Sequence, residues 1–218
     1  MRLDLAKRIT LLVLALTSIG FGASLFILSN IGSDPFNVLM QGLSNVFNVT
    51  VGQMNIITSL TYAIIIYFWD RKHLRLGTLI AVVTLGVIID LGIYLLTPVF
   101  SQDLHFLIRF STMIAGSVFI AFGIAVVYCA KIGMVPNDAL PVIVSDKTNL
   151  PFKWVRVGYD LLAVIVGMTL GGVFGIGTIV CAFITGPLIA FFTPHVEQVT
   201  NRLLTVRSKE ISSFAKAK

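Results

Sequence analysis

Two segments of the chain share one pattern: IGSDPFN at residues 31–37 and IGMVPND at residues 132–138. Each follows a long apolar run and reaches proline three residues after its glycine. Glycine allows the left-handed backbone that ends many helices, and proline is favoured in the first turn of the next one. Both segments therefore predict that a long helix ends and a short helix begins, the first at Pro35 and the second at Pro136.

The likeness extends beyond these two segments. Six of the nineteen residues from 21 to 39 are identical to the residue 101 positions later. A second block recurs with a shift of 100, so that Gly77, Thr78, Gly86 and Ile89 return as Gly177, Thr178, Gly186 and Ile189. The sequence therefore predicts two copies of one unit, a construction typical of membrane transporters and of some channels.

The composition predicts a membrane protein. Hydrophobic residues make up 56% of the chain and charged residues 12%, and the mean hydropathy is +0.94. Crossing a bilayer takes about 20 helical residues. Six apolar ranges are long enough: 9–30, 51–69, 77–97, 107–130, 152–171 and 174–193. Basic residues precede the first range, as in a secretory signal, but its length and the five later ranges favour an uncleaved helix.

Three spans in each copy is an odd number, so the second copy must enter the membrane from the opposite face. We therefore expect an all-α membrane protein of six transmembrane helices, arranged as two inverted three-helix repeats at 1–100 and 101–193. Each repeat has a short Pro-initiated helix after its first span. Such a helix is too short to cross, so it either lies in the interface or enters the protein as a re-entrant segment. Residues 194–218 are expected to form a basic amphipathic cytoplasmic tail.

The basic residues predict the orientation, because Lys and Arg near span ends are retained in the cytoplasm. With the N-terminus inside, fifteen of the sixteen lie on the cytoplasmic side and Arg109 lies outside. Both termini are then cytoplasmic. Topology and contact with the lipid bilayer account for the net charge of +6, so no nucleic-acid partner is expected.

Charged residues within spans are the first candidates for function, because each is costly in hydrocarbon. Asp90 lies about 20 Å into its span at 1.5 Å per residue, with no basic residue within a turn. Two interpretations stay open: a hydrogen-bonded structural carboxylate and a site that couples transport to a proton or cation. Asp160 follows Arg156 by one helical turn, which favours mutual neutralisation.

Further candidates come from the repeated segments. The polar and proline residues of the short helices, the threonines that open the third spans and the glutamine of a Thr50 capping box are candidates for a substrate or ion pathway: Asp34, Pro35, Asn37, Pro136, Asn137, Asp138, Thr78, Thr178 and Gln53. Four repeated glycines are expected to pack helices closely: Gly22, Gly32, Gly123 and Gly133. The sequence carries no catalytic set and no metal-ligand spacing, so we expect no enzyme, cofactor or metal.

The motifs resemble one known group. IGSDPFNVL (31–39), GLS (42–44), VGQ (51–53), LGT (76–78) and GVIID (86–90) together resemble the YczE/YyaS/YitT group of bacterial integral membrane proteins. The resemblance implies a bacterial plasma-membrane protein of about six spans and little about its biochemistry. This chain departs from the group at Phe36, where relatives often carry tryptophan after the proline.

Two functions fit these patterns. The first is a small-solute permease working by alternating access. The second is a non-transporting membrane subunit or accessory protein, which binds a partner or serves as the substrate-binding component of a multicomponent importer. A small-molecule substrate, a protein partner and a homo-oligomer all stay open.

Overall fold

The computed structural model describes residues 2–71, 74–100, 105–130 and 133–216, so Ile132 of the second segment lies outside the described residues. Every regular element in those ranges is a helix, which confirms the all-α prediction there. The helices are α1 (Arg2–Ser29), α2 (Pro35–Phe47), α3 (Val51–Trp69), α4 (Leu76–Leu96), α5 (Phe106–Ala130), α6 (Pro136–Thr148), α7 (Phe152–Thr169) and α8 (Ile176–Lys216).

Five of these helices are long and apolar enough to cross a membrane: α1, α3, α4, α5 and α8. α7 occupies the remaining predicted range, but its 18 residues include Lys153, Arg156 and Asp160. Large apolar side chains cover the outside of the bundle, and Phe68, Tyr94 and Phe183 are each more than 75% exposed. An apolar outer surface of this kind suits contact with lipid.

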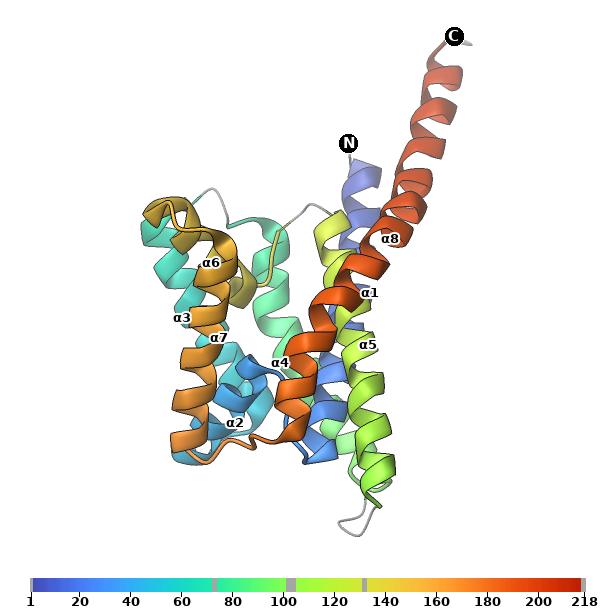
Figure 1. Ribbon diagram of the computed structural model, residues 1–218. Helices are drawn as coiled ribbons and strands as arrows, with labels where there is room; N and C mark the ends of the chain where they lie inside the picture. The colour runs from blue at the N-terminus through green and yellow to red at the C-terminus, as the bar shows by residue number, and fades with distance from the viewer. Residues whose placement is uncertain (1, 72–73, 101–104, 131–132, 217–218) are drawn as a thin grey trace.

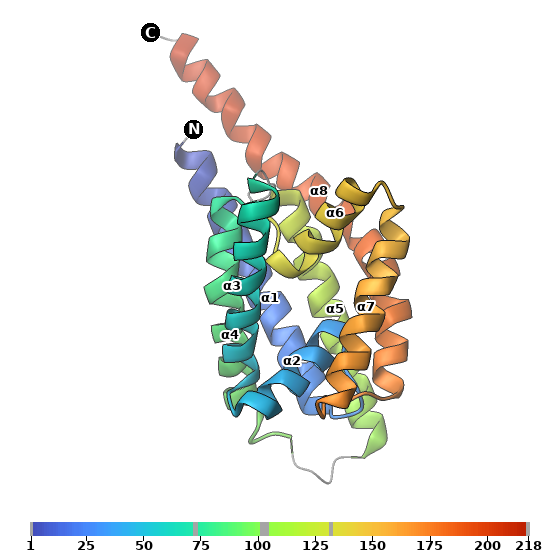
Figure 2. The same ribbon diagram turned by 90° about the vertical axis from the view of Figure 1, so that its left-hand side faces the viewer.

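The helices form two groups (Figures 1 and 2). In the first, α1 packs between α4 and α5, and α8 covers the other side of α5. In the second, α2 packs on α7 and α6 packs on α3, and the contact between α3 and α4 joins the groups. Both chain termini lie at the same end of the molecule, and α2 lies toward the opposite end (Figure 1).

Contacts between α1 and α5 come in pairs related by the shift of 101. A Cβ on Gly22 would lie 2.8 Å from Ile120 Cγ1, and a Cβ on Gly123 would lie 2.5 Å from Ile19 Cγ1. Gly22 is 101 residues before Gly123, and Ile19 is 101 residues before Ile120. Small residues therefore let the first helices of the two repeats approach closely at equivalent points.

The glycines after α1 and α5 make a second pair of equivalent contacts. Gly32 has φ +112° and Gly133 has φ +148°, backbone conformations that residues with a side chain rarely adopt. A Cβ on Gly32 would lie 2.7 Å from Thr178 Oγ1, and one on Gly133 would lie 2.8 Å from Thr78 Oγ1. Each loop thus rests on the start of the third long helix of the other repeat.

The short helix α2 begins where the sequence predicts. Asp34 is its N-cap, Pro35 is in its first turn, and Asn48 ends it in the left-handed conformation. The predicted Thr50 capping box opens α3, with Gln53 accepting from the Thr50 N–H. α2 buries three polar residues as well as apolar ones: Asn37, Gln41 and Ser44. Phe47, at the end of the helix, is 62% exposed.

α8 is longer than the sequence pattern predicts. The sixth span was expected to end at 193, and a basic amphipathic tail was expected to follow from Pro194. The helix instead continues through Pro194 to Lys216. In the turn before this proline, the Thr193 hydroxyl donates to the Ile189 carbonyl at 2.7 Å. A boundary at 194 therefore does not divide the helix.

Candidate functional site

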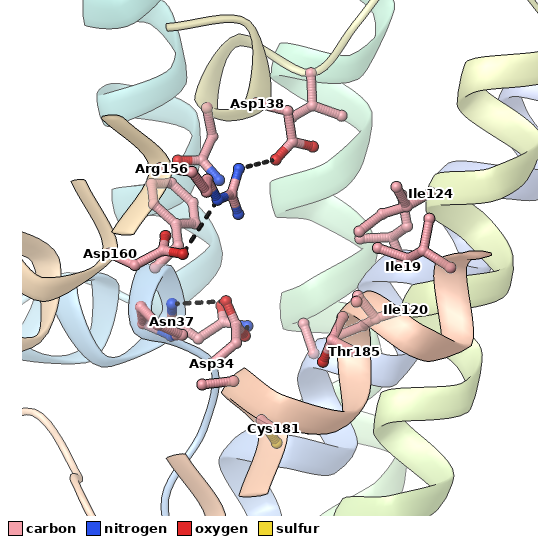
Figure 3. Close-up of a pocket in the computed structure, with 18 of the residues that line it drawn as sticks. Ile19, Asp34, Asn37, Ile120, Ile124, Asp138, Arg156, Asp160, Cys181 and Thr185 are labelled. Carbon is pink, nitrogen blue, oxygen red and sulfur yellow. Dashed lines mark hydrogen bonds and ion pairs between the residues drawn. The ribbon is translucent and has the colours of Figure 1, made fainter. Parts of the chain in front are cut away.

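A cavity of about 360 Å³ lies between the two helix groups, and helices of both repeats line it (Figure 3). Its polar side comes mainly from the start of α2, the start of α6 and the first half of α7. Its apolar side comes mainly from α1 and α5, where Ile19, Ile120 and Ile124 face the polar residues. A pocket with an apolar wall and a few convergent polar groups is the usual form of a small-molecule site.

Arg156 of α7 is held between two carboxylates. Its Nη1 donates to Asp138 Oδ1 at 3.0 Å, and its Nε donates to Asp160 Oδ2 at 3.1 Å. Asp138 is in the first turn of α6, where a negative charge also stabilises the helix dipole. This arrangement holds α6 against α7 through two charge-assisted hydrogen bonds.

Asp34 lies on the same side of the cavity, from the loop before α2 (Figure 3). It accepts from the Asn37 backbone N–H at 3.4 Å and from Asn37 Nδ2 at 2.5 Å. Burial raises the pKa of Asp34 to about 6, and the hydrogen bonds from Asn37 oppose part of that rise. Among the described residues, the structure gives Asp34 no ion pair. A carboxyl group with such a pKa is expected to change its charge at about pH 6.

Tyrosines support the polar side of the cavity from α3 and α7. The Tyr159 hydroxyl donates to Asn137 Oδ1 at the start of α6 and is 3.3 Å from the Tyr62 hydroxyl of α3. Asn137 is buried and lines the cavity. These contacts fix the first turn of α6, and with it Asp138.

Two buried polar atoms of the cavity lining have no hydrogen-bond partner among the described residues: Asn55 Oδ1 of α3 and Thr185 Oγ1 of α8. Asn55 is only 1% exposed. An unsatisfied buried polar atom costs about 1–3 kcal/mol, so such atoms are uncommon without a ligand or water to pair with them. Both atoms can accept a hydrogen bond from a bound molecule.

The polar residues of the two repeats occupy equivalent positions. Asn37 is 101 residues before Asp138, and Asn55 is 101 residues before Arg156. All four line the cavity. The first repeat thus contributes neutral amides where the second contributes an ion pair, so the cavity is chemically asymmetric.

The structure brings most of the predicted pathway residues to this cavity: Asp34, Pro35, Asn37, Asn137, Asp138, Arg156 and Asp160. It places the others elsewhere. Pro136 is fully buried beside the lining, and Gln53 serves the cap of α3. Thr78 and Thr178 are buried under the loops of the opposite repeat.

Asp90 also lies away from the cavity lining. Thr50 Oγ1 donates to Asp90 Oδ2 at 2.5 Å, and the Gly52 N–H donates to Asp90 Oδ1 at 2.9 Å. The carboxylate therefore binds the N-terminus of α3, where a negative charge is favourable. This geometry supports the first of its two interpretations, a structural carboxylate.

Sequence reasoning missed Asn55, Thr185 and Tyr128, which also line the cavity. Asn55 carried a signal, because it is a polar residue within an apolar span at the repeat position of Arg156. Cys181 lines the cavity as well, and neither it nor Cys129 forms a disulfide in the described part of the chain.

Comparison with known proteins places the chain among bacterial relatives. A family model described as "Family of unknown function (DUF6198)" matches residues 6–194. The "uncharacterized membrane protein YczE" of Bacillus subtilis (strain 168) is 30% identical over 214 residues, covering 98% of both chains. The "uncharacterized protein YyaS" of the same organism is 31% identical, covering 83% of this chain and 89% of its own length.

A third relative is an "uncharacterized protein" of Haemophilus influenzae, 30% identical over 87% of this chain and 88% of its own length. No solved structure matches the chain significantly. These relatives confirm the resemblance to YczE and YyaS, and the resemblance to YitT stays an expectation. The chain is therefore a membrane protein that belongs to the family described as DUF6198.

Proposed function

We propose that this protein is a small-solute permease that works by alternating access. In this proposal six spans form two inverted three-helix repeats, and the cavity between them holds the solute. The paired contacts of Gly22 with Ile120 and of Gly123 with Ile19 support the repeats, because a pseudo-two-fold axis between α1 and α5 would generate such pairs.

In this proposal α7 also crosses the membrane, in addition to α1, α3, α4, α5 and α8. Arg156 and Asp160 line the cavity and pair with each other, which lowers their cost within a membrane. Lys153 is in the first turn of α7, where its long side chain can reach the interface. With both termini in the cytoplasm of a bacterium, α6 lies toward the inside and α2 toward the outside.

The observation that carries the proposal is a difference between two equivalent helix contacts. In the first repeat α3 packs on α4, and the backbone of Gly52 directly contacts Gly86. The equivalent residue of α8, Gly186, lines the cavity, and a Cβ there would meet no described atom within 4 Å. The helices α3 and α4 are thus in contact at this point, whereas α8 has an open space at the equivalent point. In alternating access the two repeats exchange such conformations, so that the closed contact opens and the open one closes.

Thiol labelling tests the proposal without knowledge of the solute. With Cys129 and Cys181 replaced by alanine, Thr185→Cys is the single thiol, and a membrane-impermeant thiol reagent is applied to vesicles of each orientation. We expect reaction from both sides, because the cavity opens to each in turn. Reaction from one side only would overturn alternating access.

Two control thiols define the two sides. In the proposed topology Thr169→Cys, at the end of α7, should react only from outside, and Lys147→Cys, near the end of α6, only from inside. Reaction of either control from both sides would show leaky vesicles, and the experiment would be repeated with sealed ones.

A second candidate is a partner-binding subunit, favoured by the length of α8. The helix has 41 residues, roughly 60 Å at 1.5 Å per residue, and its C-terminal part projects beyond the bundle (Figures 1 and 2). A projecting helix offers a docking surface. Stoichiometric copurification of another protein, lost when residues 201–218 are deleted, would support this candidate.

A further inference from the structure

The formal charges that line the cavity do not balance. Three carboxylates face one guanidinium: Asp34, Asp138 and Asp160 against Arg156. Two of the carboxylates already bind that guanidinium, at 3.0 and 3.1 Å. Asp34 is left with neutral hydrogen-bond donors from Asn37. A negative charge in such a place is stabilised by a cation, because opposite charges interact strongly where water is scarce.

The unpartnered buried atoms point to the same kind of ligand. Asn55 Oδ1 accepts hydrogen bonds and cannot donate, and Thr185 Oγ1 is able to accept. The cavity therefore presents three hydrogen-bond acceptors that a ligand with N–H donors would satisfy: the Asp34 carboxylate, Asn55 Oδ1 and Thr185 Oγ1. An ammonium group carries such donors and a positive charge, whereas an anion would meet like charges at Asp34 and Asp160.

The apolar wall of the cavity indicates that the rest of the ligand is apolar. Ile19, Ile120 and Ile124 lie across the cavity from the carboxylates (Figure 3), and Ile89 adds to the lining. A bare metal ion would leave this wall without contacts, and the described residues hold no group of three His, Cys, Asp or Glu suited to a metal. An ammonium with an apolar body satisfies both sides.

We propose that the cavity binds a small organic cation, a primary or secondary amine whose ammonium pairs with Asp34 and Asn55 and whose apolar body packs on the isoleucines. This proposal rests on the assignment of the cavity as the solute site and names its substrate class. Arg156 holds Asp138 and Asp160 in place and does not itself bind the ligand.

Three probes of matched shape test the ligand class: 2-phenylethylamine as the cation, 2-phenylethanol as the neutral analogue and phenylacetate as the anion. Each is added to the purified full-length protein in detergent at up to about 10 mM, and the shift of the unfolding temperature and the binding isotherm are measured. We expect the amine to bind and stabilise the protein, and the alcohol and the acid to bind at least about tenfold more weakly. Equal or tighter binding of the acid, or no binding of the amine, would overturn the proposal.

Variants locate the binding. Asp34→Asn keeps a good N-cap for α2, so the fold is retained while the charge is lost. We expect it to weaken amine binding at least about tenfold, and Asn55→Ala to weaken it as well. Asp146→Asn, which removes an exposed carboxylate of α6 outside the cavity lining, should bind like the unmodified protein. Unchanged binding in Asp34→Asn would place the amine elsewhere and contradict the site.

The two proposals fail in different ways. If Thr185→Cys reacts from both sides but the amine does not bind, the permease stands and the organic-cation class falls. If the amine binds at Asp34 but Thr185→Cys reacts from one side only, the ligand class stands and alternating access falls.

Discussion

At the scale of single residues, the three carboxylates around the cavity differ in what holds them. Asp138 and Asp160 both bind Arg156, and their side chains are 14% and 30% exposed. Asp34 depends on Asn37 alone among the described residues. The ion-paired residues are therefore expected to contribute to stability, and Asp34 to binding.

Removing one member of the ion-pair network should destabilise the protein according to its burial. We expect Arg156→Gln to lower the free energy of unfolding by about 1–3 kcal/mol, because two carboxylates lose their charged hydrogen-bond partner. Asp138→Asn should cost more than Asp160→Asn, since Asp138 is less exposed. Unfolding temperatures in one detergent provide the measurement. A larger loss for Asp160→Asn would contradict this ranking.

Amine binding should depend on pH through Asp34, whose pKa of about 6 is raised above its ordinary value. The cation binds the ionised carboxylate, so affinity is full above pH 7 and falls as the pH drops through 6, by about tenfold for each further unit. The other titratable groups that line the cavity are Asp138, Asp160, Arg156, Tyr128 and Cys181, and Arg156 forms an ion pair with both Asp138 and Asp160. Binding isotherms between pH 5 and 8 check the prediction, and Asp34→Asn should remove the slope.

At the scale of helices, local signals in the sequence predict the elements but not their partners. Asp34 and Thr50 directly precede the helices that they cap, so the starts of α2 and α3 can be predicted from local sequence. Asp90 binds residues about 40 positions earlier, which no local pattern reveals. Arg156 and Asp160 are one turn apart and were predicted to pair, whereas Asp138 joins them only because α6 folds back on α7.

Asp90 should behave as a structural residue of the contact between α3 and α4. We expect Asp90→Leu to lower stability by about 1–3 kcal/mol, because the Gly52 N–H and the Thr50 hydroxyl lose their acceptor. Asp90→Asn keeps one acceptor oxygen and should cost less. Amine binding should survive in Asp90→Asn, and a loss of binding with unchanged stability would restore the coupling interpretation.

The glycines between α1 and α5 should tolerate no side chain. In Gly22→Ala and Gly123→Ala the new Cβ would lie 2.7 Å from the carbonyl oxygens of Gly116 and Ala15. Overpacking of this kind costs about 1–3 kcal/mol, which unfolding in detergent would show. The control is Gly158→Ala, whose Cβ meets no described atom within 4 Å. That change should be neutral or stabilising, since alanine favours helix over glycine by up to about 1 kcal/mol.

At the scale of the whole molecule, the sequence predicts a duplication and six helical ranges. The identities at shifts of 100 and 101 residues indicate the duplication, and the long apolar ranges indicate the helices. The sequence does not predict the cavity. Asn55, Thr185 and the isoleucines of α1 and α5 come together only through packing between repeats. Nor does it predict that Gly86 and Gly186, which are equivalent in the sequence, have different surroundings: Gly86 lies against Gly52, whereas a Cβ on Gly186 would meet no described atom within 4 Å.

The proposed alternating access requires a second state in which α7 closes on α8. Exchange of conformations would bring Lys153, the counterpart of Gly52, to Gly186, the counterpart of Gly86. We expect the double variant Lys153→Cys and Gly186→Cys, in the background lacking native cysteines, to form a crosslink slowly in the free protein. A ligand that favours either state should change the rate. Absence of any crosslink under oxidising conditions would contradict this second state.

α8 is both a wall of the cavity and the segment that leaves the bundle. Pro187 follows Gly186, and α8 changes direction along its length (Figures 1 and 2). Proline lacks an N–H, so the helix bends easily there. A change of about 10° at Pro187 would swing Lys216, roughly 44 Å further along at 1.5 Å per residue, through about 8 Å. The position of the far end of α8 would then depend on whether the cavity is open or closed, and a protein bound there would be sensitive to that state.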